Sequence, residues 1–316
     1  MLRLLSAAAL AGGAFAATPR RGGEASLGGH LGVAGSSRGS VKVSTFFWNV
    51  HWECSVGQAA GSHPDCKEKV GKRFVELASQ TGADIVFSVM LADAQNVPSK
   101  LKSFGLAEGW TQVDGTCYYE GDDKQFDWDV TALAFGPAWT VIKSGGGCLL
   151  PYWDTYAFAV ALVEPPSIIQ GCPQLCVLGV HAPQKKITQG SELVKNVCGN
   201  LADTCSIAMG DWNQEAKYVG SHWQQLIGGA VPAVEEIVPD VTTCCWSAGV
   251  FHGMVHDKRG EFDHIATSIA GARHVGQIVH DYQHTDMMPA LQHKPVTAHM
   301  QLPMAGRLGD GGCTVF

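Results

Sequence analysis

Residues 207–214 form the segment IAMGDWNQ, an apolar run that ends in the polar residues Asp211 and Asn213. With its neighbours, the apolar part predicts a buried β-strand over residues 205–209. An aspartate and an asparagine directly after such a strand are costly to bury without a purpose. Their position therefore indicates a functional site at the end of this strand.

Polar side chains lie at the ends of other predicted strands as well. Together they supply oxygen ligands for a hard cation such as Mg²⁺ or Ca²⁺, and imidazoles that can activate water. A single histidine or aspartate at a strand end is more often a satisfied structural residue, so the argument depends on the whole set. Besides Asp211 and Asn213, the set contains Asn49, His181, Asp263 and His293.

Hydrophobic periodicity predicts alternating strands and helices from residue 42 to residue 301, with no internal linker or repeat. Segments 111–128 and 244–261 are expected to be loops. Strands are predicted over residues 42–50, 84–90, 129–135, 138–143, 156–163, 175–181, 205–209, 262–268 and 294–301, and helices over 65–81 and 188–203 and after Glu215.

The composition is that of a folded globular protein. Of 316 residues, 46% are hydrophobic and 16% are charged, which is ample for a large core. The net charge is −7, and residues 1–40, with four Arg and one Glu, leave −10 for the rest of the chain. A protein that coats nucleic acid through a basic groove is disfavoured, because binding of phosphate backbones needs clustered Lys and Arg.

The N-terminus has the features of a targeting sequence. Residues 1–17 combine a short basic start, an apolar stretch and a small-residue cleavage site, which predicts a signal peptide. Residues 18–40 are a Gly/Ser/Arg-rich linker or a transit segment, so secretion or an endomembrane lumen is expected, with plastid import as the alternative. The apolar stretch is too short to span a bilayer comfortably. Residues 41–303 are expected to form the folded domain and residues 304–316 a flexible tail.

Eleven cysteines make disulfide bonds expected in an exported protein. Cys172 with Cys176 and Cys198 with Cys205 are close enough in sequence to pair. Cys54, Cys66 and the adjacent Cys244 and Cys245 leave the connectivity open, and the odd total leaves one thiol over. No zinc-binding Cys-x-x-Cys pattern is present.

Five segments, in this order along the chain, resemble the endonuclease/exonuclease/phosphatase superfamily, the deoxyribonuclease I-like proteins. The resemblance spans about residues 43–302, and GDWN within 207–214 is its most specific part. It implies an α/β (α+β) fold, a four-layer sandwich of two packed, mostly antiparallel β-sheets flanked by helices. The segments are FFWNVHW (46–52), ADIVFSVMLAD (83–93), LGVHAPQ (178–184), IAMGDWNQ (207–214) with FDHIATS (262–268), and QHKPVTAHM (292–300).

The resemblance also implies a role for each polar residue. His293 would be the general base, oriented by Asp263. His181 would donate to the leaving group or stabilise the phosphate, and Asp129 lies where family members place the Glu that orients this histidine. A buried carboxylate fixes the tautomer of an imidazole and raises its basicity, which is the physical reason for both pairs. Asn49, Asp211 and Asn213 would position the metal ion, the phosphate and the attacking water.

Two residues depart from the family pattern at metal-binding positions. Met90 stands where the family has its principal metal-binding Glu, and Gln292 stands where it has an Asp. A thioether cannot replace a carboxylate as a ligand of a hard cation. Three nearby acids, Glu53, Asp93 and Asp286, are candidates to substitute for the lost charges.

The sequence therefore predicts a phosphoester hydrolase, a phosphodiesterase or nuclease that depends on Mg²⁺, Mn²⁺ or Ca²⁺. The alternative is a catalytically degenerate relative that acts as a binding or scaffold protein, which the changes at Met90 and Gln292 favour. The expected partner is a phosphodiester, nucleic acid included, without stable membrane insertion; the oligomeric state is left open. Trp48, Trp52 and Trp212 flank the predicted site and are candidates to line a substrate cleft.

Overall fold

The computed structural model describes residues 39–50, 66–91, 101, 104–120, 126–150, 156–184, 186–200, 205–227, 235–237, 243–244, 249–251, 254–256, 260–280 and 293–305. All of them belong to one compact unit, Arg38–Phe316. Within these residues no helix is both long enough and apolar enough to cross a membrane.

The first sheet has six strands in the order β13-β14-β1-β2-β4-β3. Its two central strands β1 and β2 run parallel, and every other neighbouring pair is antiparallel. The strands are β1 (Ser40–Asn49), β2 (Ile85–Val89), β3 (Thr111–Glu120), β4 (Phe126–Phe135), β13 (Arg273–Val279) and β14 (Val296–Pro303).

The second sheet also has six strands, in the order β5-β6-β7-β8-β12-β9. Only β7 and β8 run parallel. A separate two-stranded sheet pairs β10 (Gly249–Phe251) with β11 (Met254–His256). The six strands are β5 (Thr140–Cys148), β6 (Ala157–Glu164), β7 (Leu175–His181), β8 (Cys205–Asp211), β9 (Glu235–Ile237) and β12 (Asp263–Thr267).

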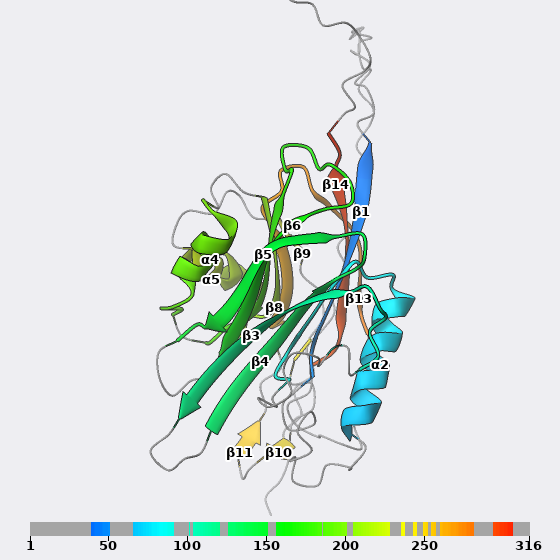
Figure 1. The fold of residues 1–316 in the computed structure, drawn as a ribbon. Helices are drawn as coiled ribbons and strands as arrows, with labels where there is room; N and C mark the ends of the chain where they lie inside the picture. Colours follow the sequence, from blue (N-terminus) through cyan, green and yellow to red (C-terminus); the bar gives the residue numbers. More distant parts are fainter. Residues whose placement is uncertain are drawn as a thin grey trace, which may run out of the picture. The chain divides into compact units, whose positions relative to one another are not determined.

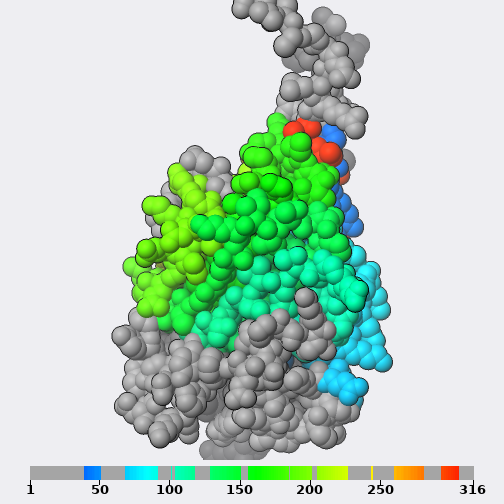
Figure 2. Space-filling view, in the orientation of Figure 1, coloured from blue at the N-terminus to red at the C-terminus, as the bar shows by residue number. Residues whose placement is uncertain are grey.

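Helices cover the outer face of each sheet. Helix α2 (Cys66–Gln80) packs on the first sheet through an apolar layer that includes Phe74 and Trp48. Helices α4 (Ser191–Cys198) and α5 (Ala216–Ile227) pack on the second sheet. In Figure 1, α2 is cyan and lies on the opposite side of the strands from the yellow-green α4 and α5. Figure 2 is a space-filling view in the same orientation, in which the cyan and yellow-green atoms again lie on opposite sides. The predicted four-layer α/β sandwich is confirmed.

The core between the two sheets depends on close packing of aromatic rings. Phe47 on β1 and Phe87 on β2 stack with their ring centroids 5.5 Å apart, and both are fully buried. Opposite them, Gly179 on β7 leaves room for the Phe87 ring, since a Cβ atom there would lie 2.2 Å from Phe87 Cε2. This glycine is therefore required by the approach of the sheets rather than by a turn.

Two strands of the first sheet were not expected from the sequence. Residues 111–120 form β3, although the segment 111–128 was predicted to be a loop. Strand β13 was also missed, because its side chains are mostly exposed or half-buried and give no hydrophobic alternation. Both lie at the sheet edges, where pairing with β4 and β14 decides their structure. Residues 249–251 and 254–256, also predicted as loop, pair as short strands.

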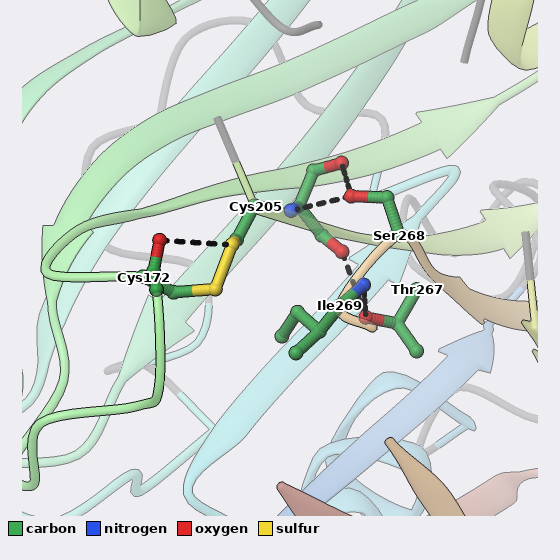
Figure 3. The surroundings of a disulfide bond; sticks show 7 residues. Cys172, Cys205, Thr267, Ser268 and Ile269 are labelled. Atoms are coloured by element: carbon green, nitrogen blue, oxygen red, sulfur yellow. Dashed lines mark hydrogen bonds between the residues drawn. A yellow bond between two sulfur atoms is a disulfide. The ribbon is translucent and has the colours of Figure 1, made fainter. Parts of the chain in front are cut away.

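The sequence left the disulfide connectivity open, and the pairs that are close in sequence are not the ones that form. The bonds are Cys172–Cys205 and Cys176–Cys198. Cys172 belongs to the core between the sheets and Cys205 packs against that core, whereas Cys176 and Cys198 lie on the helix-covered face of the second sheet. Each cysteine therefore pairs with one on its own face of the sheet. Figure 3 shows the Cys172–Cys205 bond beside Ser268. The Oγ atom of Ser268 accepts a hydrogen bond from the backbone N–H of Ser206, the residue after Cys205.

A third disulfide joins Cys117 on β3 to Cys148 on β5, and so links the two sheets covalently. Cys244 is also disulfide-bonded. Disulfides of this number fit a protein that folds in an oxidising compartment.

Candidate functional site

The polar strand ends meet around the carboxylate of Asp211, the last residue of β8. β7 runs parallel to β8 and places His181 directly beside Asp211. β12 runs antiparallel on the other side of β8 and pairs Asp263 with Asp211. The register of the second sheet therefore brings three predicted site residues to one edge.

The Asp211 carboxylate is 1% exposed and receives hydrogen bonds from two amides. Asn49 Nδ2 donates to Oδ2 at 2.9 Å, and the backbone N–H of Asn213 donates to Oδ1 at 2.9 Å. Asn49 ends β1 in the first sheet, so the carboxylate is held from both sheets.

His293 and Asp263 form a buried pair. Nδ1 of His293 lies 2.9 Å from both carboxylate oxygens of Asp263, and its Nε2 lies 3.5 Å from Asp211 Oδ2. The backbone carbonyl of His293 accepts a hydrogen bond from Trp48 Nε1 at 3.0 Å. Asp263 is held in turn by Thr243, whose Oγ1 accepts its backbone N–H at 3.1 Å. The imidazole is thus oriented with Nε2 toward Asp211.

The charges around His293 change its acidity. Burial alone would lower the pKa of this imidazole, but the carboxylates of Asp263 and Asp211 outweigh burial and raise the pKa to about 9. His293 is therefore protonated at neutral pH when no other cation is close. Neutralisation of Asp211 by a bound cation would remove one of the two charges that hold the pKa high.

His181 forms a second buried pair on the other side of Asp211. Its Nδ1 lies 2.7 Å from Asp129 Oδ2, and its Nε2 lies 3.9 Å from Asp211 Oδ2. The Tyr156 ring packs against the imidazole in an edge-to-face arrangement, with 4.8 Å between ring centroids. Burial lowers the pKa of His181, but the charge and hydrogen bond of Asp129, with the charge of Asp211, outweigh burial and raise it. Two imidazoles oriented by carboxylates therefore face one central carboxylate.

Two residues at the site have left-handed backbone conformations that side chains rarely adopt. Asn213 has φ 48° and its side-chain Nδ2 donates to the carbonyl of Ala182 at 2.9 Å. Met90, just past the end of β2, has φ 57°. Asparagine tolerates this region, but a non-glycine residue such as methionine is uncommon there. Strain of this kind is concentrated at functional sites.

Met90 brings no carboxylate to the site. Its side chain is half-buried and packs against the core between the sheets. Four other residues were discussed as departures from the family's metal ligands or as substitutes for them. They lie outside the described residues: Glu53, Asp93, Asp286 and Gln292. The proposal that these acids replace the missing ligands stays a prediction.

Three findings at the site differ from the sequence analysis or add to it. Trp48 and Trp212 are fully buried in the helix-covered layers, so the prediction that they line a substrate cleft is wrong. Trp52 lies outside the described residues. Thr243 and Tyr156 support the two imidazoles and were not predicted, because nothing local in the sequence distinguishes a threonine or tyrosine that packs on a distant histidine.

The donor atoms fit a hard divalent cation. Among the described residues, Asp211, Asp263 and His293 each place a ligand atom within 4.8 Å of the others. Both oxygens of Asp263 already face His293 Nδ1, which leaves Asp211 as the carboxylate for a cation. Mg²⁺ is commonly bound through one or two carboxylates, with waters and substrate phosphate completing its coordination. The side-chain amide of Asn49, which donates a hydrogen bond to Asp211, also carries an oxygen of the kind that binds Mg²⁺.

The sandwich of two sheets with helices outside is a fold that this chain shares with solved structures of endonuclease/exonuclease/phosphatase proteins. Solved structures show the likeness at low sequence identity. TDP2 from D. rerio, solved with a single-strand DNA product, is 15% identical, with a TM-score of 0.52 over 82% of this chain and 98% of that one. An endonuclease/exonuclease/phosphatase from Bacteroides vulgatus is 11% identical, with a TM-score of 0.53 over 83% of this chain and 99% of that one.

The catalytic domain of human Nocturnin, solved with a bound sulfate anion, is another similar structure. It is 15% identical, with a TM-score of 0.50 over 84% of this chain and 97% of that one. No protein-family model matches the chain, and no curated protein sequence matches it. The likeness therefore shows the fold, and the activity has to be argued from the site.

Proposed function

We propose that this protein is a metal-dependent phosphoester hydrolase that cleaves phosphodiesters by attack of water. The observation that carries the proposal is the convergence of two imidazoles on one buried carboxylate. Nε2 of His293 and Nε2 of His181 lie 3.5 Å and 3.9 Å from Asp211 Oδ2, and each ring is held by its own carboxylate. Burying these five groups, two imidazoles and three carboxylates, is costly unless they serve chemistry.

Each residue has a defined task in this proposal. His293, oriented by Asp263, takes a proton from the attacking water. His181, oriented by Asp129, donates a hydrogen bond or proton to the phosphate or the leaving oxygen. Asp211 binds the cation. Asn49 and Asn213 are further ligands and position water and phosphate. A bound Mg²⁺, Mn²⁺ or Ca²⁺ supplies charge that stabilises the developing negative charge on the phosphoryl oxygens.

The proposed substrate is a phosphodiester, with nucleic acid as the first class to test. The similar TDP2 structure contains a single-strand DNA product, and the similar Nocturnin structure contains a sulfate anion. The acidic net charge, −7 for the whole chain, argues against tight binding along an extended phosphate backbone. A cation at the site would supply positive charge locally, so cleavage of a short segment is compatible with this balance.

A second candidate function follows from Met90. Its side chain packs against apolar core residues. The family resemblance implies that a ligand carboxylate belongs at this position, and a site without it would have one ligand charge fewer. A chain of this kind could bind phosphate-containing partners without hydrolysing them. This candidate and the hydrolase differ in one measurable respect, which is turnover.

The deciding experiment is cleavage of plasmid DNA and of bis(4-nitrophenyl) phosphate by the purified protein with Mg²⁺, Mn²⁺ or Ca²⁺, against EDTA. We expect hydrolysis in the presence of a cation and none in EDTA, and an Asp211→Ala variant should be inactive under every condition. Calorimetric titration with each cation measures binding separately. Absence of turnover together with absence of cation binding would support the second candidate function, a protein that binds its partner without hydrolysing it.

Met90→Glu is expected to tighten Mg²⁺ binding by about tenfold or more, because cation affinity rises with the number of charged oxygen ligands. Calorimetry measures the affinity, and the hydrolysis rate should rise at subsaturating Mg²⁺. Met90→Gln is the matched control, since it has nearly the same shape without the charge. If the two variants bind Mg²⁺ equally, Met90 is not at a ligand position.

We also propose that residues 1–17 are a signal peptide, that residues 18–40 are a linker or transit segment, and that the chain enters a secretory or endomembrane compartment. The disulfides that the described residues contain support export, because such bonds persist in oxidising compartments. Residues 41–303 as the domain and 304–316 as the tail remain predictions. N-terminal sequencing of the mature protein tests the cleavage site.

A further inference from the structure

One hydrogen-bonded carboxylate connects the two sheets at the site. Asp129 lies on β4 in the first sheet, and its Oδ2 is 2.7 Å from His181 Nδ1 on β7 in the second sheet. The same oxygen accepts the backbone N–H of Ala157 on β6 at 2.7 Å. Asp129 Oδ1 is buried and has no hydrogen-bond partner among the described residues. The position of His181 therefore depends on how close β4 lies to the second sheet.

The Cys117–Cys148 disulfide closes a ring around this contact. Cys117 is the direct cross-strand partner of Asp129 in the ladder between β3 and β4. Cys148 is the direct cross-strand partner of Ala157 in the ladder between β5 and β6. The disulfide joins the two cysteines, and the hydrogen bond to Asp129 joins the two partners. Any separation of the sheets at this edge must stretch both connections.

Glycines on the same two strands bring the sheets unusually close. Gly115 precedes Cys117 by two residues on β3, and a Cβ atom at Gly115 would lie 1.9 Å from the carbonyl oxygen of Phe158. Gly146 precedes Cys148 by two residues on β5, and a Cβ atom there would lie 2.5 Å from Gly115 Cα. The backbones are thus in direct contact, which lets the short side chain of an aspartate reach across to the second sheet.

We propose that Cys117 and Cys148 are positioning residues for the reaction. Their disulfide holds β3 and β4 against β5 and β6, so that Asp129 keeps its hydrogen bond to His181 and fixes the ring with Nε2 toward Asp211. The expected effect of the disulfide on the hydrolysis rate rests on the proposed hydrolase function. The structural part, that the disulfide maintains the contact of Asp129 with the second sheet, is measurable without any activity.

The test compares two double variants that each remove one disulfide. Cys117→Ser with Cys148→Ser removes the bond at the site. Cys172→Ser with Cys205→Ser is the control, because the two bonds span nearly equal sequence separations, 31 and 33 residues. Cys205 begins β8, six residues before Asp211, which places the control bond about 20 Å from the site at the ordinary rise of a strand.

The direct readout is hydrogen exchange of the Ala157 amide, which donates to Asp129. We expect exchange to be about tenfold faster or more in the site variant than in the control, at a temperature where circular dichroism shows both variants folded. Equal exchange rates at Ala157 would overturn the proposal. If the serine pair does not fold, Cys117→Ala with Cys148→Val fills the same space with apolar groups and is measured in the same way.

The second readout is hydrolysis of bis(4-nitrophenyl) phosphate with Mg²⁺. We expect kcat of the site variant to fall about tenfold or more with little change in KM, the range found when a group that orients a functional histidine is removed, while the control keeps its kcat. Asp129→Glu in the site variant should recover part of the loss, because the longer side chain spans a wider gap. Equal kcat in the two double variants would overturn the proposal that the Cys117–Cys148 disulfide supports the hydrolysis rate.

The failure of this inference can be distinguished from failure of the proposed function. A wild-type protein that does not hydrolyse the diester under any condition contradicts the hydrolase. The comparison of Ala157 exchange then still supports or overturns the positioning role of the disulfide.

Discussion

Asp211→Asn is expected to lower phosphodiester hydrolysis by about 10³-fold or more, the size of loss seen when one member of a group that acts as a unit is removed. The amide keeps the shape of the side chain but removes the charge that both imidazoles face and that would bind the cation. The measurement is kcat/KM on bis(4-nitrophenyl) phosphate over a range of Mg²⁺ concentrations. Calorimetry on the same variant should show that Mg²⁺ binding is lost together with the rate.

A matched control for this change is Asp84→Asn. Asp84 is a half-buried aspartate whose Oδ2 accepts the backbone N–H of Ser44 at 2.8 Å, and it lies just before β2, at the end of that strand away from the site. We expect this variant to bind Mg²⁺ and to hydrolyse the diester as the wild type does. If Asp211→Asn and Asp84→Asn have the same activity, Asp211 is not the central ligand and the proposed mechanism is wrong.

His293→Gln is expected to lower kcat by about 10²-fold to 10⁴-fold, the contribution typical of a general base. Glutamine can still hydrogen-bond to Asp263 but cannot take a proton from water. The wild-type rate should rise with pH as the imidazole loses its proton, and the residual rate of the variant should lack this rise. His299→Gln on β14 is the control, because its Nδ1 bonds to Ser44 Oγ and it has no contact with Asp211 among those described.

The raised pKa of His293 also predicts a pH dependence of stability in EDTA. A group whose pKa rises on folding binds its proton more tightly in the native state, so the protonated form stabilises the fold fully below the ordinary pKa of 6.5. That contribution is lost as the pH rises through about 9. Denaturant titrations over this interval should show a falling free energy of unfolding, with a shallower fall in His293→Gln. Identical slopes would contradict the interaction with Asp263 and Asp211.

Most strands that line the site could be predicted from local sequence. β1, β7 and β8 are continuous apolar or alternating runs, and each ends in a polar residue that serves the site: Asn49, His181 and Asp211. Such runs signal a strand because burial of their side chains is required whatever lies opposite. Helix α4 was predicted over 188–203 but spans only Ser191–Cys198, since Gly190 and Gly199, with φ of 91° and 75°, limit it.

Edge strands and disulfides could not be predicted in this way. β3 contains an aspartate and two threonines besides Gly115, so its alternation is weak, and its structure comes from pairing with β4. Cys172 and Cys176 are close in the chain but lie on opposite faces of the second sheet. Proximity in sequence could not reveal this, because Cys172 lies in the turn before β7 rather than in the strand, so strand alternation does not decide which face it occupies.

The amino-acid sequence was enough to predict the class of fold and to place Asn49, His181, Asp211, Asp263 and His293 at or near strand ends. That Met90 replaces a ligand carboxylate is implied by the family resemblance and stays a prediction. The three-dimensional structure was needed to show that Asp211 lies at the centre, with both imidazoles directed to it, and that Asp129 crosses from one sheet to the other beside Cys117 and Cys148. The two kinds of information differ in how far apart in the chain the contributing residues lie. Hydrophobic alternation is a property of neighbouring residues, whereas strand register and the distance between sheets depend on contacts among residues far apart in the chain.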